Sequence, residues 1–323
     1  MLRTPVCTLL GIEYPIALGG MSSVYAPDLV AAVSNAGGLG TLGATYLDPA
    51  KLKDGCAAIR SKTDKPFGLN FLIFEFIEDN FAAALAQKPA VVAFAWPRPD
   101  QDIATLVRRA HDAGSKVTFM VSGVPEALRS AEAGADVIVA QGTEGGGHVG
   151  WQGTFPLVPM VVDAVAPVPV MAAGGIADGR GLAAALALGA DGVLLGTRLL
   201  ATVESPIHQN YKQAIVDSDG HDTVLTEIPD IAAAWHWPGA MSRSRRNRFI
   251  ERWAGREWDL RKNQAAVHAA VKDARARGDV DEAPLAFGQD AGLIHDIPPA
   301  AEIIERMVRQ ARQILEIKLQ RYI

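Results

Sequence analysis

The feature that most restricts the fold of this chain is a repeated alternation of short apolar runs and alanine-rich amphipathic segments. The apolar runs, each a candidate strand, span residues 15–20, 39–44, 67–73, 90–95, 116–121, 136–140, 169–174 and 192–196. Nearly continuous apolar strands need cover on both faces, which indicates a parallel sheet of repeated βα units. Eight such units favour an α/β fold of the (β/α)8 TIM barrel type, with an open doubly wound sheet as the alternative.

The segments between these runs carry helix signals. Residues 26–36, 100–113, 124–133 and 179–188 have helical patterns, and each is followed by a glycine, namely Gly37, Gly114, Gly134 and Gly189. A glycine directly after a helix suits the left-handed conformation of the C-cap. Asp48 and Pro49 form an N-cap and first-position pair that predicts the start of another helix.

The alternation of candidate strands and helices stops after Thr202, which suggests that the chain has three parts. Residues 1–203 are expected to form the barrel. Residues 204–293 lack the βα alternation, contain a group of tryptophans that includes Trp235, Trp237 and Trp253, and carry a run of arginines. They are expected to form a mainly helical insertion, either a lid or a small second domain. Residues 294–323 repeat apolar side chains at helical spacing, which predicts a C-terminal helix packed on the barrel.

Bulk composition narrows the class of protein. With 323 residues, of which 49% are hydrophobic, the chain can bury a large core, and its net charge of −5 gives no reason to expect nucleic acid or a membrane surface as a partner. Cys7 and Cys56 are the only cysteines, so no disulfide framework is expected, and both are assigned to the core. The first residues lack an apolar signal region, and a cytoplasmic protein is the expectation.

Residues 141–150 form a glycine-rich segment directly after the sixth apolar run. Five of these ten residues are glycine, and His148 is the only histidine among them. Glycine lets the backbone approach a ligand closely, and a histidine held there can titrate near neutral pH. The alternative is a flexible surface loop with an incidental histidine, but loops that follow buried strands often carry function.

Other strand ends carry residues suited to a phosphorylated ligand. Gly174 and Gly175 lie at the end of the seventh run, and Gly196 is the last residue of the eighth, so backbone N–H groups could form a phosphate site there. Asn70 and Gln141 place amides at other strand ends, where they could pair with the edge of a flat heterocycle or merely tie strands together. Together these features suggest a phosphorylated flat cofactor such as FMN.

At this point the sequence resembles the nitronate monooxygenase family, formerly called 2-nitropropane dioxygenases. The resemblance covers the whole chain and rests on these motifs in order: Gly19-Gly20-Met21, Gly68-Leu69-Asn70, the segment from Gln141 to Gly150, Ala173-Gly174-Gly175-Ile176, Gly196-Thr197-Arg198 and Gly288-Gln289-x-Ala291-Gly292. The wider superfamily also contains FMN-dependent enoyl-acyl-carrier-protein reductases and NADH:quinone reductases. The motifs are therefore more specific for the superfamily than for one reaction.

The resemblance implies an FMN-containing TIM barrel with His148 as the catalytic residue. The residues it implies at or beside the flavin are Gly19, Gly20, Met21, Asn70, Gln141, Gly146, Gly174, Gly175, Leu194, Leu195, Gly196 and Thr197. The chain departs from the family pattern at Gly145, where alanine is usual. Met120 also stands where some quinone-reductase relatives carry a lysine.

The resemblance implies oxidation of alkyl nitronates, and of nitroalkanes if His148 removes their α-proton, with O₂ to carbonyl compounds and nitrite. The alternatives are an NAD(P)H-dependent reductase acting on a quinone or an enoyl thioester, and a catalytically idle barrel that binds FMN or a phosphorylated metabolite. Oligomeric state stays open, with a homodimer as one option.

Several further residues have two interpretations. Trp151 and Phe155 either line the substrate pocket or pack elsewhere, and Met21 is a further pocket candidate. Trp235, His236 and Trp237 suggest a lid cluster, although a small core under the insertion is favoured. The arginines are either a nucleotide or carrier site or, more in keeping with such runs, a solvated helical face; they are Arg243, Arg245, Arg246 and Arg248. No spacing predicts a metal site.

Overall fold

The computed structural model describes residues 2–318 and contains an eight-stranded parallel barrel. Its strands are β1 (Ile16–Leu18), β2 (Gly40–Gly43), β3 (Phe67–Leu72), β4 (Val91–Ala95), β5 (Lys116–Val121), β6 (Val137–Gln141), β8 (Val170–Ala173) and β9 (Gly192–Leu195). Each pairs in parallel with its neighbours along the chain, and β9 pairs with β1. A parallel bridge between Ala17 and Leu39 closes the ring between β1 and β2. The TIM barrel is confirmed, and the open sheet is excluded.

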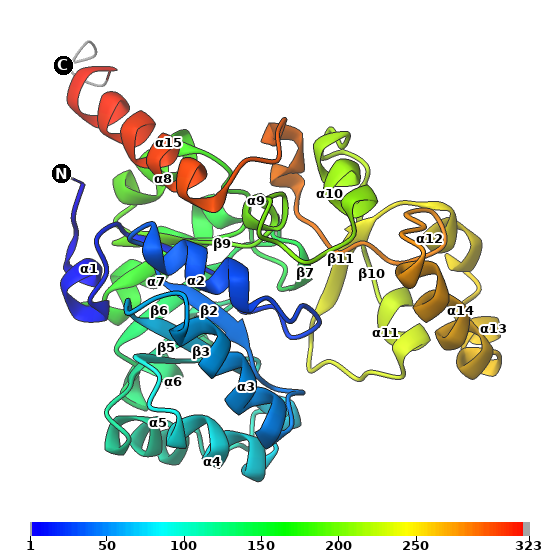
Figure 1. Cartoon of the computed structure of the whole chain (residues 1–323), viewed down its shortest axis with the longest axis horizontal. Helices are drawn as coiled ribbons and strands as arrows, with labels where there is room; N and C mark the ends of the chain where they lie inside the picture. Colours follow the sequence, from blue (N-terminus) through cyan, green and yellow to red (C-terminus); the bar gives the residue numbers. More distant parts are fainter. Residues whose placement is uncertain (1, 319–323) are drawn as a thin grey trace.

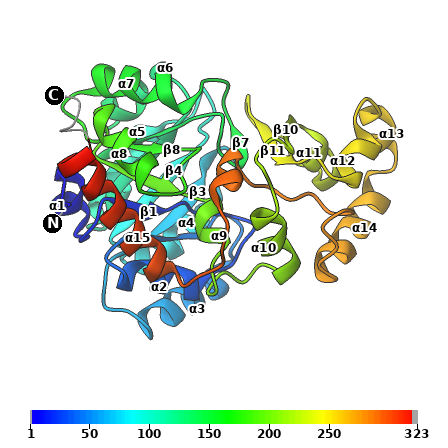
Figure 2. The ribbon, with the colours of Figure 1, turned by 90° about the horizontal axis from the view of Figure 1, so that it is seen from above.

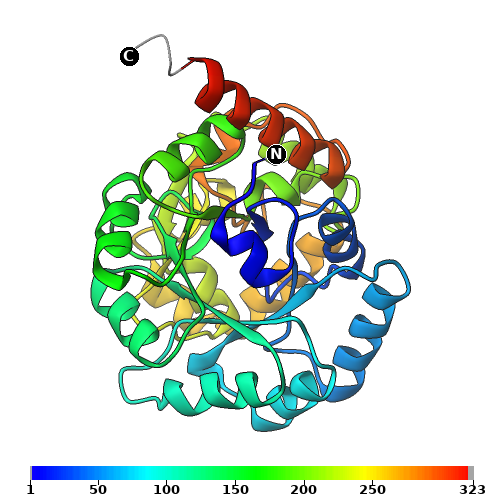
Figure 3. The same cartoon turned by 90° about the vertical axis from the view of Figure 1, so that its left-hand side faces the viewer.

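Helices surround this barrel, as Figure 3 shows in a view along its axis. They are α2 (Pro27–Asn35), α3 (Pro49–Arg60), α4 (Glu78–Ala86), α5 (Ile103–Asp112), α6 (Val124–Glu132), α7 (Thr154–Val165), α8 (Gly179–Ala187) and the short α9 (Thr197–Leu200), with a 3-10 turn at Ile73–Glu75. Asp48 caps α3 by accepting a hydrogen bond from the backbone N–H of Lys51. The four expected C-cap glycines all have positive φ, between 85° and 96°. These local signals were therefore confirmed.

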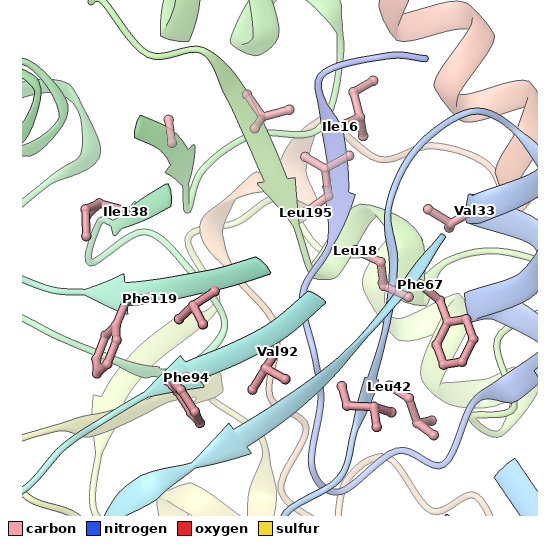
Figure 4. Close-up of a cluster of buried hydrophobic side chains, with 14 of the residues drawn as sticks. Ile16, Leu18, Val33, Leu42, Phe67, Val92, Phe94, Phe119, Ile138 and Leu195 are labelled. Atoms are coloured by element: carbon pink, nitrogen blue, oxygen red, sulfur yellow. The ribbon is translucent and has the colours of Figure 1, made fainter. Parts of the chain in front are cut away.

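Side-chain alternation along the strands produces two apolar layers. Residues that point outward, such as Ile16, Leu18 and Phe94, pack against the surrounding helices in the main core, and Figure 4 shows part of this layer. Inward residues such as Val139 and Met171 form a second cluster inside the barrel. Helix α1 (Pro5–Leu10) contributes Val6, Cys7 and Leu10 to that inner cluster. Because α1 fills the amino-terminal end of the barrel, the opposite end is left for a ligand.

The insertion contains more strand than the sequence predicted. Its helices are α10 (Gln209–Val216), α11 (Ile228–Ala233), α12 (Arg248–Trp253), α13 (Glu257–Lys262) and α14 (Gln264–Ala276). The strands β10 (Thr223–Thr226) and β11 (Met241–Arg245) form an antiparallel sheet with β7 (Gly147–Val149) of the glycine-rich segment. Figures 1 and 2 show the insertion projecting from the barrel on the side of this small sheet.

The chain then returns to the barrel. A 3-10 turn (Gln289–Leu293) leads to α15 (Ala300–Gln313), which packs on α8 and α2 through Ile303, Ile304 and Met307. The chain continues as a π-helical turn (Ile314–Lys318), while the expected apolar position Leu319 and the following residues lie outside the described range. Among residues 2–318, no helix has the length and apolarity needed to cross a membrane.

Candidate active site

A cavity of about 430 Å³ opens at the carboxyl ends of the barrel strands. Its floor consists of inward-facing strand residues such as Thr41, Ala93 and Met171, and its outer wall comes from the insertion. The volume falls in the usual range for small-molecule sites, roughly 300–1,000 Å³. The cavity lies at the face where TIM barrels carry their chemistry, so it is the candidate active site.

Two buried amide oxygens in this cavity lack a hydrogen-bond partner among residues 2–318. Asn70 donates its side-chain NH₂ to the backbone carbonyl of Ala93 at 3.3 Å, which leaves its Oδ1 unpaired. Gln141 Oε1 is also buried without a partner, and both residues line the cavity. An unsatisfied buried acceptor costs about 1–3 kcal/mol, so a ligand that donates hydrogen bonds at this wall would be stabilised.

The glycines of the expected phosphate site surround the same cavity. Gly174 and Gly175 have φ of 92° and 74°, conformations that side chains disfavour, and their turn leads towards α8. A Cβ added to Gly196 would meet no protein atom within 4 Å, so this residue faces open space. A Cβ on Gly20 would instead lie 2.2 Å from the Cβ of Asn70, so the glycine permits that close packing.

Most residues that the resemblance placed at a flavin line this cavity: Gly19, Gly20, Met21, Asn70, Gln141, Gly146, His148, Gly174, Gly175, Leu194, Gly196 and Thr197. Leu195 is buried in the outer core layer and does not line the cavity. Trp151 follows β7, is 69% exposed and does not line the cavity; Phe155 is 71% exposed and does not line it either. The structure therefore gives no support to the pocket interpretation of Trp151.

His148 lies in β7, opposite Ser242 of β11. Its Nε2 is 2.9 Å from Oδ1 of Asp230, and its ring stacks on Trp237 with centroids 3.4 Å apart and planes 10° apart. Asp230 and Trp237 both line the cavity and both come from the insertion. Sequence reasoning missed Asp230, because 82 residues separate it from His148 and no local pattern marks such a pair.

Aromatic side chains form the wall beside His148. Trp237 packs with Leu72, Phe74 and Trp96 of the barrel, and Trp96 adopts a φ of 56° that is uncommon for a bulky residue. Trp235 stacks on Tyr46, another cavity residue, at 5.9 Å. Burial is the main cause that raises the pKa of the Tyr46 phenol, with a hydrogen bond to Glu75 adding to it.

These contacts correct the favoured account of the tryptophan cluster. The insertion does have a small core, but its apolar side chains include Ile228, Phe249 and Leu260, with Trp253 packed against them. Trp235 and Trp237 instead reach across to the barrel and contribute to the cavity. The lid alternative matches their positions better.

The arginine run is not a helical face. Arg243 and Arg245 belong to strand β11, and Arg243 is buried, donating hydrogen bonds to the carbonyl oxygen of Thr143 and the hydroxyl of Thr223. Arg245 pairs with Asp222 at 3.1 Å. Arg248 begins α12 and pairs with Asp281 at 3.2 Å. These guanidinium groups therefore connect parts of the insertion and the glycine-rich segment.

Asp290 places a buried carboxyl group beside the glycine turns. It lines the cavity, is 6% exposed and lies near the hydroxyl of Thr197. Burial raises its pKa to about 7, although its own backbone N–H, the Thr197 hydroxyl and Arg198 partly oppose the shift. In the folded cofactor-free protein the neutral acid is favoured up to about that pH, and a neutral acid can donate a hydrogen bond.

Replacing Asp290 with asparagine is expected to remove a pH-dependent term from stability. The folded protein keeps the Asp290 proton up to about pH 7, whereas the unfolded chain loses it near its ordinary pKa of 3.8. Wild-type stability from this group therefore falls as pH rises between about 4 and 7, by up to about 1.4 kcal/mol per pH unit. Thermal unfolding of the cofactor-free proteins at pH 5 and pH 8 measures this. The stability of Asp290→Asn relative to wild type should be higher at pH 8 than at pH 5. An equal difference at both pH values would contradict this.

The barrel, its cavity and the histidine at the cavity wall place the protein in the class of TIM barrels with an enzyme-like site at the carboxyl ends of the strands. A family model described as nitronate monooxygenase matches residues 3–80 and 75–310. A probable nitronate monooxygenase of Staphylococcus aureus (strain JH9) is 32% identical over an alignment of 359 residues that covers 96% of this chain and 98% of that protein. The chain belongs to the nitronate monooxygenase family and is a flavin-dependent oxidoreductase.

Two solved structures support this assignment. FabK from Thermotoga maritima shares 38% identity with a TM-score of 0.90, and the match covers 100% of both chains. A nitroalkane oxidase from Streptomyces ansochromogenes shares 28% identity with a TM-score of 0.82, covering 96% of this chain and 99% of that one. The fold thus extends over both the barrel and the insertion in these proteins.

Proposed function

We propose that this protein is an FMN-dependent nitronate monooxygenase that oxidises alkyl nitronates, and nitroalkanes after loss of a proton, with O₂ to carbonyl compounds and nitrite. The observation that carries this proposal is His148, fixed at the cavity wall by Asp230 and Trp237. The curated relatives of similar length and the nitroalkane oxidase neighbour support the same chemistry.

The residues in the cavity fit FMN. Asn70 Oδ1 and Gln141 Oε1 are unpaired acceptors suited to an N–H edge of the ring system. The turns at Gly174, Gly175 and Gly196, with the Thr197 hydroxyl and Asp290, would hold the phosphate. When bound, FMN would supply the electron transfer between substrate and O₂, while the chain supplies binding, orientation and proton handling.

His148 would act on the substrate in either of two ways. A neutral imidazole can accept the α-proton of a nitroalkane, and an imidazolium can stabilise the anionic nitronate. Around it, Trp96, Trp237 and Leu72 offer an apolar surface for an alkyl group. A wall of this kind suits a small carbon chain with one polar end, which is the chemistry of an alkyl nitronate.

The reductase alternative has less support from the insertion. That alternative assigned the arginine run to NAD(P)H or a carrier protein, but Arg243, Arg245 and Arg248 are engaged with partners inside this chain. Met120, a cavity residue, also provides no positive charge at the end of β5. The similarity to FabK keeps a reductase as the second candidate.

Anaerobic mixing separates the two candidates. We expect the yellow flavin absorbance to bleach rapidly with an alkyl nitronate and only slowly with NADH or NADPH. Admission of O₂ should then restore the colour and release nitrite, which a colorimetric assay quantifies. Rapid bleaching by NADH or NADPH without bleaching by nitronate would favour the reductase. Failure to reconstitute the purified chain with FMN would count against both.

A further inference from the structure

The contact between His148 and Asp230 joins the two parts of the molecule at the cavity. The 2.9 Å contact links Nε2 in the glycine-rich segment of the barrel to a carboxylate in α11 of the insertion. Both side chains are largely removed from solvent, with exposed fractions of 13% and 8%. A carboxylate buried without a partner would be strongly destabilising. Asp230 is therefore expected to keep its contact with His148 and to restrict the position of the imidazole.

The imidazole is constrained from three directions. Pairing of β7 with β11 fixes the backbone at His148 opposite Ser242. The indole of Trp237 covers one ring face at 3.4 Å, and Asp230 occupies the Nε2 edge. The backbone of Asp230 is fixed in turn, because its N–H donates to Glu227 and its carbonyl accepts from Trp235. The side chain therefore has little freedom to rotate.

The hydrogen-bonding roles of the two ring nitrogens follow from this arrangement. An ionised carboxylate only accepts hydrogen bonds, so a neutral imidazole facing Asp230 carries its proton on Nε2. Nδ1 is then the acceptor, and the one side-chain hydrogen bond of His148 within residues 2–318 uses Nε2. Because His148 lines the cavity and its Nε2 is occupied by Asp230, Nδ1 is the ring nitrogen left for a substrate.

We propose that Asp230 is a positioning residue that holds His148 as the Nε2–H tautomer, so that Nδ1 is the nitrogen that takes the substrate proton. The base role rests on the proposed function. In that step a C–H bond at the α-carbon of a neutral nitroalkane breaks, its electron pair stays on the substrate as the nitronate, and the proton bonds to Nδ1. The resulting imidazolium is stabilised by Asp230 and by the face of Trp237.

The proposal predicts that replacing Asp230 slows the oxidation of a neutral nitroalkane much more than the oxidation of its preformed nitronate. Asp230→Asn lets the amide either donate to or accept from the ring, so the tautomer is no longer fixed and the imidazolium loses its counter-charge. We expect kcat/KM for a neutral nitroalkane to fall by about 10²-fold or more, the usual contribution of positioned proton transfer. With the preformed nitronate the fall should be only several-fold, because no carbon-bound proton has to be removed.

Two measurements on the flavin-loaded enzyme test this. The first is the long-range ¹H–¹⁵N spectrum of histidine-labelled protein, with His148 assigned by comparison with His148→Gln. Wild type should show a neutral His148 protonated on Nε2, and Asp230→Asn should show a mixture. The second is the pair of rates for neutral nitroalkane and nitronate. Asp222→Asn, which removes a carboxylate paired with Arg245 in the same insertion, is the matched control and should leave the ratio of the two rates unchanged.

The wild-type spectrum tests the proposal even if the Asp230 variant does not fold. A neutral His148 protonated on Nδ1 would overturn it, as would equal losses with the two substrate forms. If wild type oxidises neither substrate while the spectrum shows the Nε2–H form in wild type and its loss in Asp230→Asn, the proposed function fails and the positioning role stands.

Discussion

Replacing His148 with glutamine is expected to lower kcat/KM for a neutral nitroalkane by about 10²–10⁴-fold, the contribution of a positioned general base. Glutamine keeps a polar side chain of similar reach but cannot accept a proton at neutral pH. With a preformed nitronate the expected loss is smaller, roughly 10–100-fold, because only a charge-assisted hydrogen bond of about 1.5–3 kcal/mol disappears. Nitrite release and oxygen consumption under steady-state conditions measure both losses.

The flavin content of this variant should stay close to that of wild type. The His148 side chain contacts Asp230 and Trp237, whereas the glycine turns and the two unpaired amides lie on other strands. His221→Gln is a suitable control, because His221 is an exposed histidine in the insertion. Wild-type rates in a flavin-loaded His148→Gln protein would refute the assignment of His148 as the catalytic residue.

The barrel could be predicted from the sequence because its signals are local. Each strand is a largely apolar run, four of the helices are followed by a glycine such as Gly114 or Gly134, and Asp48 with Pro49 marks the start of α3. The observed strand bounds differ from the expected ones by only a residue or two at either end. Repetition of one unit then fixes the order of strands without knowledge of distant contacts.

The wall of the site could not be predicted in the same way. Strand β7 has three residues, begins with Gly147 and shows no apolar alternation, so its pairing with β11 has no local signal. Asp230 and Trp237 gain their roles only when the insertion lies against the barrel. Trp151 shows the converse, since its proximity in sequence to His148 does not bring it into the cavity.

The family resemblance supplied the catalytic histidine and the glycine turns but not the residues that orient them. The motifs name positions along the chain, and the structure adds which of those positions face one another. Asp290 is an example: it occupies the variable position of a motif at 288–292, and only folding places its carboxyl group beside Thr197 in a dry environment. The protonation of a group such as Asp290 therefore depends on its surroundings in the fold, which the motif does not give.

Adding one methyl group at Gly196 is expected to weaken FMN binding far more than it weakens the fold. Gly196 is the N-cap of α9 and lines the cavity, and a Cβ there would meet no protein atom within 4 Å. Because its φ is −111°, alanine needs no left-handed backbone. In Gly196→Ala the methyl group would enter the space proposed for the phosphate, and loss of a charge-assisted contact of about 1.5–3 kcal/mol corresponds to roughly 10–100-fold weaker binding.

Gly123→Ala is the matched control for this test. Gly123 is the N-cap of α6 at another strand-to-helix turn, its φ is −163°, and an added Cβ would meet its nearest neighbour at 3.7 Å, an ordinary contact. Gly123 does not line the cavity, so its alanine variant should bind FMN as wild type does. Quenching of flavin fluorescence during titration of each cofactor-free protein gives the dissociation constants, and thermal unfolding of the same samples reports the fold. If Gly196→Ala binds FMN as tightly as Gly123→Ala, the phosphate does not lie at the β9 turn. If both variants fold and only Gly196→Ala binds FMN more weakly, the result supports a phosphate site in the open space beside Gly196.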